Sequence, residues 1–190
     1  MVSSNLTFFL AEGKPTYTDG GVAAEYTWII VVLPFLAALL ITFLGKYLPL
    51  QGAEIALGTI GFIFAFSSYL LYLNVTEGVA SEFFINVGSI GSFDLEFGWV
   101  VDGLSIMMYF VVGTVATLVF IYATNYMKGE VRYTFFFTSL TLFAGSMLVL
   151  VSSPTLLQLL IGWELVGVCS YLLIGHYWDC LLYTSPSPRD

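Results

Sequence analysis

Charged residues are scarce in this chain of 190 residues, and basic residues are the scarcest of all. Only 9% of the residues are charged, with 5 Lys or Arg against 13 Asp or Glu and a single His. So little charge cannot cover the surface of a soluble domain of this length, which excludes that class. The acids stand mainly between apolar runs, where they indicate loops, and we expect no nucleic-acid partner.

Cysteine is almost absent as well, with only 2 residues in the chain. Cys169 lies inside an apolar run, and Cys180 lies in an atypical C-terminal segment. Two cysteines so placed provide neither a disulfide framework nor the ligand spacing of a metal site, so we expect no metal in this chain.

Apolar residues dominate instead: 58% of the chain is hydrophobic, 17% is aromatic and the mean hydropathy is +0.92. Five runs approach or exceed the roughly 20 apolar residues that cross a bilayer as a helix. They are residues 28–44, 53–73, 103–123, 134–151 and 155–175. Each is apolar all round, and none has the short alternating segments of a β-barrel. The sequence predicts an all-α membrane protein, a polytopic transmembrane helix bundle of about five spans.

Residues 74–99 form a long polar connection between the second and third runs. Within it, the segments FFINVGSI and SFDLEFGW lie on either side of Gly91. Two short apolar and aromatic runs around a glycine predict a short external β-hairpin lying on the membrane surface. An irregular acidic loop is the alternative.

Glu164 is the strongest functional candidate, because it stands near the middle of the apolar run 155–175. An ionised side chain at the bilayer centre costs roughly 3 kcal/mol, so such groups usually face protein or water and mark ion or proton routes. We therefore interpret Glu164 as a residue of proton translocation. The alternative is a protonated Glu that only makes one interhelical hydrogen bond.

Helical spacing places Gly167, Val168 and Tyr171 on the same face as Glu164, which makes Tyr171 a possible support of the proton path. Gly162 and Gly167 flank the acid. Such small residues in a membrane helix permit either a close helix contact or room for a water beside the carboxylate.

Three further residues are weaker candidates to support a proton path. Asp102 precedes the third run, either as a helix N-cap or as a proton entry point. His176 ends the fifth run at headgroup level, either as an aromatic-belt residue or as a proton relay. Thr141, with the other hydroxyls of the fourth run, can hydrogen-bond water or bridge to neighbouring backbone.

Three segments between Phe97 and Trp178 resemble a known family: FGWVVDGLSIMM, YATNYMKGE and SMLVLVSSPTLLQLLIGWELVGVCSYLLIGHYW. They are similar to the N-terminal part of the antiporter-like membrane subunit, subunit L, of proton-pumping NADH:quinone oxidoreductase, respiratory complex I. The most specific piece is GWELVGVCSYLLIG, from Gly162 to Gly175. The first two runs and the hairpin agree with the family in layout more than in sequence.

The resemblance implies a many-helix translocase subunit in which a membrane-embedded glutamate, here Glu164, pairs with a lysine on a later helix beyond residue 190. Charge shifts along such pairs would move protons while quinone is reduced elsewhere. NADH, flavin, iron–sulfur clusters and quinone belong to other subunits of the family's complex, so no cofactor is expected in this chain. The chain would be a fragment, inactive alone.

The resemblance also implies partners and a location. The partners would be the other membrane subunits of complex I and the lipid bilayer. The location would be an energy-transducing membrane, the bacterial plasma membrane.

Two other functions stay open. One is the large subunit of multi-subunit sodium/proton antiporters, which shares the fold. The segment VGVCSY favours the respiratory subunit but does not exclude the antiporter subunit. The third possibility is a structural membrane scaffold in which Glu164 is only a packing group.

The two ends of the chain are expected to lie outside the bundle, which would span residues 26–178. Residues 1–25 carry acids and lack the basic start of a signal peptide, so we expect no cleavage there. The positive-inside rule makes them an external N-terminal segment. Residues 180–190, CLLYTSPSPRD, abandon the family pattern for a Ser/Pro cluster and predict a disordered, non-native tail.

The basic residues predict the orientation in the membrane. Lys46 lies between the first two runs, and Lys128 and Arg132 lie between the third and fourth, whereas residues 74–99 contain no Lys or Arg. The positive-inside rule then places these three residues in the cytoplasm and the hairpin outside. A reporter fused after Thr76 should behave as external and one after Lys128 as cytoplasmic; the reverse pattern would contradict this topology.

Overall fold

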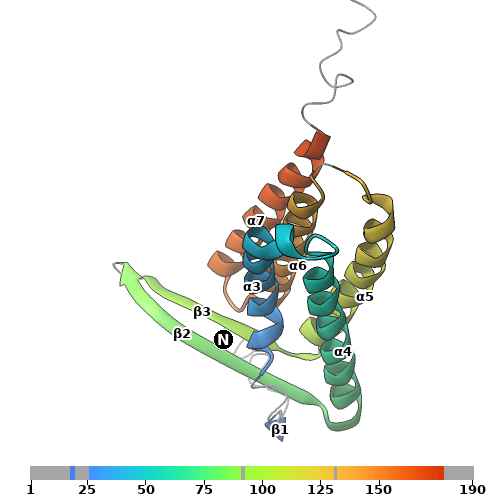
Figure 1. The fold of residues 1–190 in the computed structure, drawn as a ribbon. Coiled ribbons are helices and arrows are strands. Elements are labelled where there is room, and N and C mark those ends of the chain that lie inside the picture. Colours follow the sequence, from blue (N-terminus) through green and yellow to red (C-terminus); the bar gives the residue numbers. More distant parts are fainter. Residues whose placement is uncertain (1–17, 20–25, 91–92, 131, 178–190) are drawn as a thin grey trace, which may run out of the picture.

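The computed structural model describes residues 18–19, 26–90, 93–130 and 132–177 (Figure 1). The expected tail over residues 180–190 lies outside these described residues. So does the expected N-terminal segment, apart from the short strand β1, Thr18–Asp19.

Five long helices form the bundle: α3 Trp28–Leu44, α4 Ala53–Glu77, α5 Gly103–Tyr126, α6 Tyr133–Ser152 and α7 Leu156–Ile174. Each is long and apolar enough to cross a membrane, which confirms the predicted all-α bundle of five spans. α4 continues past its predicted apolar run, residues 53–73, because no residue before Gly78 ends the helix. Gly78, with a φ of 67°, ends it.

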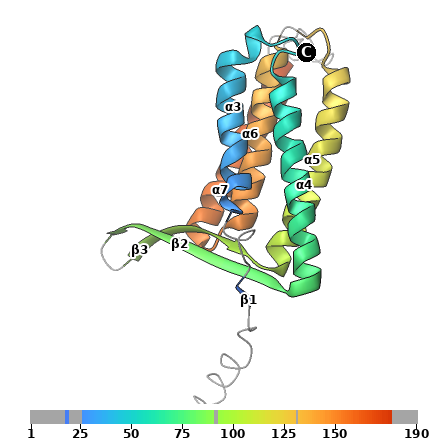
Figure 2. The same cartoon turned by 60° about the horizontal axis from the view of Figure 1, so that its bottom comes forward.

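A β-hairpin lies across one end of the bundle and reaches out beside it (Figure 2). Its strands are β2, Val79–Ile90, and β3, Phe93–Val101, paired antiparallel with an irregularity between Asn86 and Gly88. β1 pairs in parallel with the start of β2. The predicted hairpin is confirmed, and it is longer than expected because the pairing continues almost to the start of α5.

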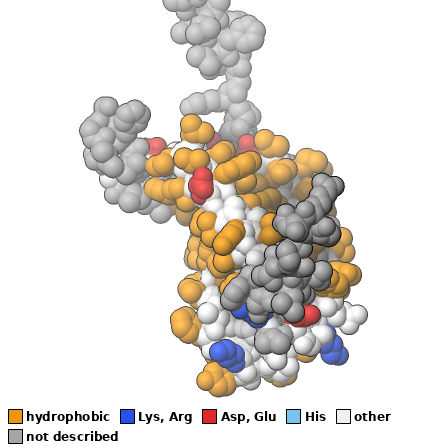
Figure 3. All heavy atoms as spheres, turned by 90° about the horizontal axis from the view of Figure 1, so that it is seen from above, with side chains coloured by type: hydrophobic (Ala, Val, Ile, Leu, Met, Phe, Trp, Pro, Cys, Tyr) orange, Lys and Arg blue, Asp and Glu red, His pale blue; other side chains and the backbone are white. Residues whose placement is uncertain are grey.

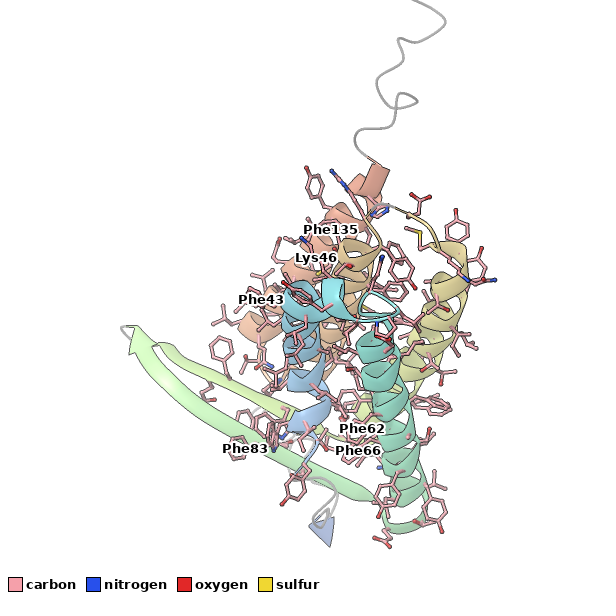
Figure 4. All side chains as sticks on the ribbon, in the orientation of Figure 1. Phe43, Lys46, Phe62, Phe66, Phe83 and Phe135 are labelled. Atoms are coloured by element: carbon pink, nitrogen blue, oxygen red, sulfur yellow. The ribbon has the colours of Figure 1, made fainter. Side chains whose placement is uncertain are left out.

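The opposite end of the bundle carries the turn η1, Gly45–Tyr47, the connection from α5 to α6, and the turn η2, Gly175–Tyr177. Lys46 therefore lies at the same end as Lys128 and Arg132, because successive helices alternate in direction. Figure 4 shows Lys46 near this end and Phe83, on β2, near the other.

Helix α6 lies at the centre of the packing, since it contacts α3, α4, α5 and α7. Its buried side chains, among them Phe137 and Leu148, join one apolar core with residues of α3, α4 and α5, such as Phe120. α3 crosses α6 where Pro34 meets Gly145: a Cβ built on Gly145 would lie 3.0 Å from the Pro34 Cβ. α7, in contrast, packs chiefly against α6 alone.

The contact between α6 and α7 is closest at Gly162. A Cβ built on Gly162 would lie 2.9 Å from both the backbone N and the Cα of Leu150, closer than real Cβ atoms approach backbone. We expect Gly162→Ala to destabilise the folded protein by about 1–3 kcal/mol, because one of the two helices must shift. Thermal unfolding of the detergent-solubilised full-length protein measures the effect.

Gly58→Ala is the matched control for this prediction. Gly58 also lies inside a membrane helix, but nothing stands within 4 Å of a Cβ built on it. Alanine there should be neutral or stabilising by about 0.5–1 kcal/mol, since Gly is the poorer helix former. Equal melting temperatures for the two variants would contradict the close contact at Gly162.

Candidate functional site

Glu164 lies close to the middle of α7, and its side chain is exposed on the side of the helix that faces away from the bundle. Among the described residues it has no hydrogen bond and no ion pair. The acid is therefore displayed at mid-helix on a surface that the described part of the chain leaves uncovered.

The residues expected to share its face do so. Tyr171, one helical repeat further on, is 74% exposed, and the same surface carries Leu157, Leu160, Gly167 and Val168. This surface is named the Glu164 face below. It is apolar except for the carboxylate and the Tyr171 hydroxyl, which is the composition of a helix face that meets lipid or other helices.

The inner face of α7 fixes the direction in which Glu164 points. Gln158, Gly162 and Cys169 are its buried residues, and they recur at the spacing of one helix face. The Cys169 Sγ lies 3.7 Å from the Oγ of Ser146 on α6. Glu164 is two residues after Gly162, about 200° around the helix, so packing of Gly162 on α6 turns the acid outward.

The two glycines beside the acid have different roles. Gly162 is buried and makes the close contact with Leu150. Gly167 is exposed, and nothing lies within 4 Å of a Cβ built on it. Of the two uses expected for small residues here, Gly162 serves helix contact, and Gly167 leaves open space beside the carboxylate.

Asp102 and Thr141 do not lie on the Glu164 face. Asp102 is the N-cap of α5 at the hairpin end, where its Oδ1 accepts from the backbone N–H of Ser105 at 2.7 Å. Thr141 is buried in α6, and its hydroxyl donates to the carbonyl of Phe137 at 2.7 Å. Asp102 therefore has the geometry of a helix cap, and Thr141 that of a hydroxyl bonded to its own backbone. A role of either residue in a proton path stays a prediction.

His176 lies at the basic end of the bundle, at the end of α7, and is only 4% exposed. Its ring packs against two aromatic rings of α6, with centroids 6.5 Å from Phe135 and 5.6 Å from Phe136. A headgroup-level belt residue or a proton relay was expected, and the side chain is enclosed where it contacts the first turn of α6. Its part in a proton relay stays a prediction.

Gln158 is a structural residue that the sequence reasoning missed. Its amide Oε1 accepts from the backbone N–H of Gly98 at 2.9 Å, and its Nε2 donates to the Gly98 carbonyl at 2.8 Å. The Thr155 hydroxyl donates to the carbonyl of Glu96 beside it, at 3.2 Å. These bonds fasten β3 of the hairpin to the helix that carries Glu164. A lone amide at the start of an apolar run was the available signal.

Five membrane-spanning helices with a carboxylate displayed at mid-helix define an integral membrane protein with an intramembrane acid. Comparison with known proteins then points to one family. The profile of the family described as NADH-ubiquinone oxidoreductase (complex I), chain 5 N-terminus, matches residues 88–137. The chain is similar to complex I chain 5 subunits over most of its length.

The relatives extend the match over most of the chain. NAD(P)H-quinone oxidoreductase chain 5 of Picosynechococcus sp. is 41% identical over 162 residues, which cover 82% of this chain and 24% of the relative. The subunit 5 of the Paulinella chromatophora chromatophore is 39% identical, covering 83% of this chain and 25% of the relative. The chloroplastic subunit 5 of Cryptomeria japonica is 39% identical, with 87% and 23% covered. The chain thus spans about a quarter of the length of these relatives.

The fastening of the hairpin by Gln158 is testable. In Gln158→Leu the buried N–H and C=O of Gly98 lose their partners, at about 1–3 kcal/mol for each unsatisfied group. We expect the amide of Gly98 to exchange with deuterium much faster and the hairpin to become sensitive to protease in the full-length protein.

Ser153→Ala serves as the control for this variant. The Ser153 hydroxyl lies at the same end of the bundle but donates only to the carbonyl of Val149 in its own helix. It should leave exchange at Gly98 unchanged. Unchanged exchange in Gln158→Leu as well would show that the hairpin is held by other contacts.

Proposed function

We propose that this chain forms part of a proton-translocating membrane subunit of an NAD(P)H-quinone oxidoreductase, and that Glu164 is the residue that takes up and releases the proton. Similarity to the chain 5 family supports the assignment to such a complex. The observation that supports the role of Glu164 is its place at the middle of α7, exposed and without a partner among the described residues.

The need to solvate the Glu164 carboxylate supports a transport role. An ionised carboxylate facing hydrocarbon costs at least roughly 3 kcal/mol, so the Glu164 face needs a covering that supplies water or a cation. The curated relatives are about three and a half times as long as this chain, so in this proposal later segments of the protein cover that face. In this proposal a lysine on one of them is the cation.

A movable cation makes an acid into a proton carrier. A lysine near the carboxylate stabilises its ionised form, and withdrawal of that lysine favours protonation. Glu164 would release a proton in the first state and accept one in the second. The open space at Gly167 leaves room for a water through which the proton would pass, and the Tyr171 hydroxyl lies on the same face.

The electrons follow another route in this proposal. NADH, flavin, iron–sulfur clusters and quinone would be held by other subunits, and the other membrane subunits of the complex would be the partners in an energy-transducing membrane. The bacterial plasma membrane is the proposed location. The relatives are named as subunits of quinone oxidoreductases, which favours this function over a sodium/proton antiporter.

Glu164→Gln in the full-length protein within its complex tests the role of the acid. Glutamine keeps the shape of the side chain but carries no exchangeable carboxyl proton, so we expect NADH-driven proton translocation to fall by about 10²-fold or more while the complex still assembles. Proton transport into sealed vesicles, with assembly followed by native gel electrophoresis, gives the two readouts. Glu164→Asp should retain part of the activity.

Glu82→Gln is the control, because Glu82 is an exposed acid of the hairpin strand β2. It should translocate protons at the original rate. Undiminished translocation in Glu164→Gln would leave only the scaffold function. Proton movement that depends on a sodium gradient and not on NADH would identify an antiporter.

A further inference from the structure

A pocket of about 450 Å³ lies at the end of the bundle opposite the hairpin, between the η1–α4 turn and the α5–α6 connection. Its volume falls in the range of roughly 300–1,000 Å³ that is typical of small-molecule sites. Its lining includes Leu50, Gln51, Leu57, Asn125, Lys128 and Glu130. None of these residues belongs to the Glu164 face, so the pocket is a separate feature.

The wall of the pocket is held by hydrogen bonds from several helices. These are Leu50 N–H to Glu54 Oε1 at 3.0 Å, Thr134 Oγ1 to the Gln51 carbonyl at 3.1 Å, and Tyr133 OH to the Thr124 carbonyl at 3.4 Å. Residues of α4 and α6 thus hold the η1–α4 turn and the end of α5, which line two sides of the pocket.

The pocket lies at the depth of the lipid headgroups. It opens where α4 begins and α5 ends, and the last turns of α5 carry two tyrosines, Tyr122 and Tyr126, each 65% exposed. Their rings stack with centroids 5.4 Å apart. Exposed tyrosines on membrane helices mark the boundary between hydrocarbon and headgroups. Figure 3, which looks onto this end, shows Lys and Arg side chains around it.

The lining combines two kinds of surface. Leu50 and Leu57 provide an apolar wall, whereas Lys128 and Asn125 provide donors suited to a phosphate. Glu130 stands in the same lining as an acceptor of opposite charge. A bare anion would be repelled by Glu130, and a purely apolar ligand would leave both charges unused.

We propose that this pocket binds the headgroup of a membrane phospholipid whose head carries a hydrogen-bond donor. Lys128 and Asn125 bind the phosphate, Glu130 accepts from the ammonium or hydroxyl group of the head, and the acyl chains leave along Leu50 and Leu57. Basic pockets between helices on the positive side of membrane proteins recognise lipid heads by the same chemistry. The site binds lipid whether or not Glu164 transfers protons.

Photo-crosslinking in the full-length complex tests this site. Benzoylphenylalanine replaces Leu50, which lines the pocket, or Tyr47, which is 87% exposed at the same end and does not line it. The complex is placed in vesicles of equal phosphatidylethanolamine, phosphatidylglycerol and phosphatidylcholine. We expect the probe at Leu50 to capture the two lipids with donor heads about fivefold more than phosphatidylcholine, and the probe at Tyr47 to capture all three alike.

Two substitutions separate the parts of the site. Lys128→Gln should abolish the enrichment at Leu50, and Glu130→Ala should remove the preference over phosphatidylcholine while capture continues. Lys46→Gln, at the same end but outside the pocket, should change neither. Capture at Tyr47 that stays the same in every variant shows that the bundle is intact.

Several results would overturn the proposal. The first is the same lipid mixture at both probe positions, and the second is an enrichment that survives Lys128→Gln. The third is loss of lipid capture on addition of millimolar inorganic phosphate, which would show a site for free phosphate instead.

Discussion

Helices in hydrocarbon are not driven together by water, so they approach closely only where small residues let their backbones meet. Three neighbouring pairs of this bundle meet at a glycine: α5 on α4 at Gly113, α6 on α3 at Gly145, and α7 on α6 at Gly162. A Cβ built on any of the three would lie 3.2 Å or less from an atom of the neighbouring helix. The arrangement of the bundle around α6 depends on these contacts, and so does the rotation of each helix about its own axis.

The direction of Glu164 follows from one of them. Because Gly162 must face α6, Glu164, two places further on, must face outward. The polar side chains on the inner face of α7 are those of Gln158 and Cys169. The buried hydroxyls of α6, such as those of Thr141 and Ser146, donate to carbonyls of their own helix. The described helices therefore position the carboxylate and leave its face uncovered among the described residues.

The polar groups at the two ends of the bundle differ in their partners. At one end a buried amide, Gln158, bonds both the N–H and the C=O of Gly98 and so joins the hairpin to α7. At the other end the turns around Gln51 and Lys128 enclose a pocket with both apolar and charged walls. The first contact is satisfied within the described chain, whereas the second offers donors and an acceptor to a ligand at the membrane surface.

The sequence by itself determined the helices, the hairpin and the grouping of residues on the Glu164 face. Backbone hydrogen bonds in hydrocarbon must close within each helix, so apolar length alone specifies a span, and the helical repeat alone puts Tyr171 beside Glu164. The tertiary structure decided which way that face points, which glycine makes a helix contact, and how Gln158 and His176 come to be buried. These outcomes depend on the packing of residues distant in sequence, such as Leu150 on Gly162 and Gly98 on Gln158, which no local pattern encodes.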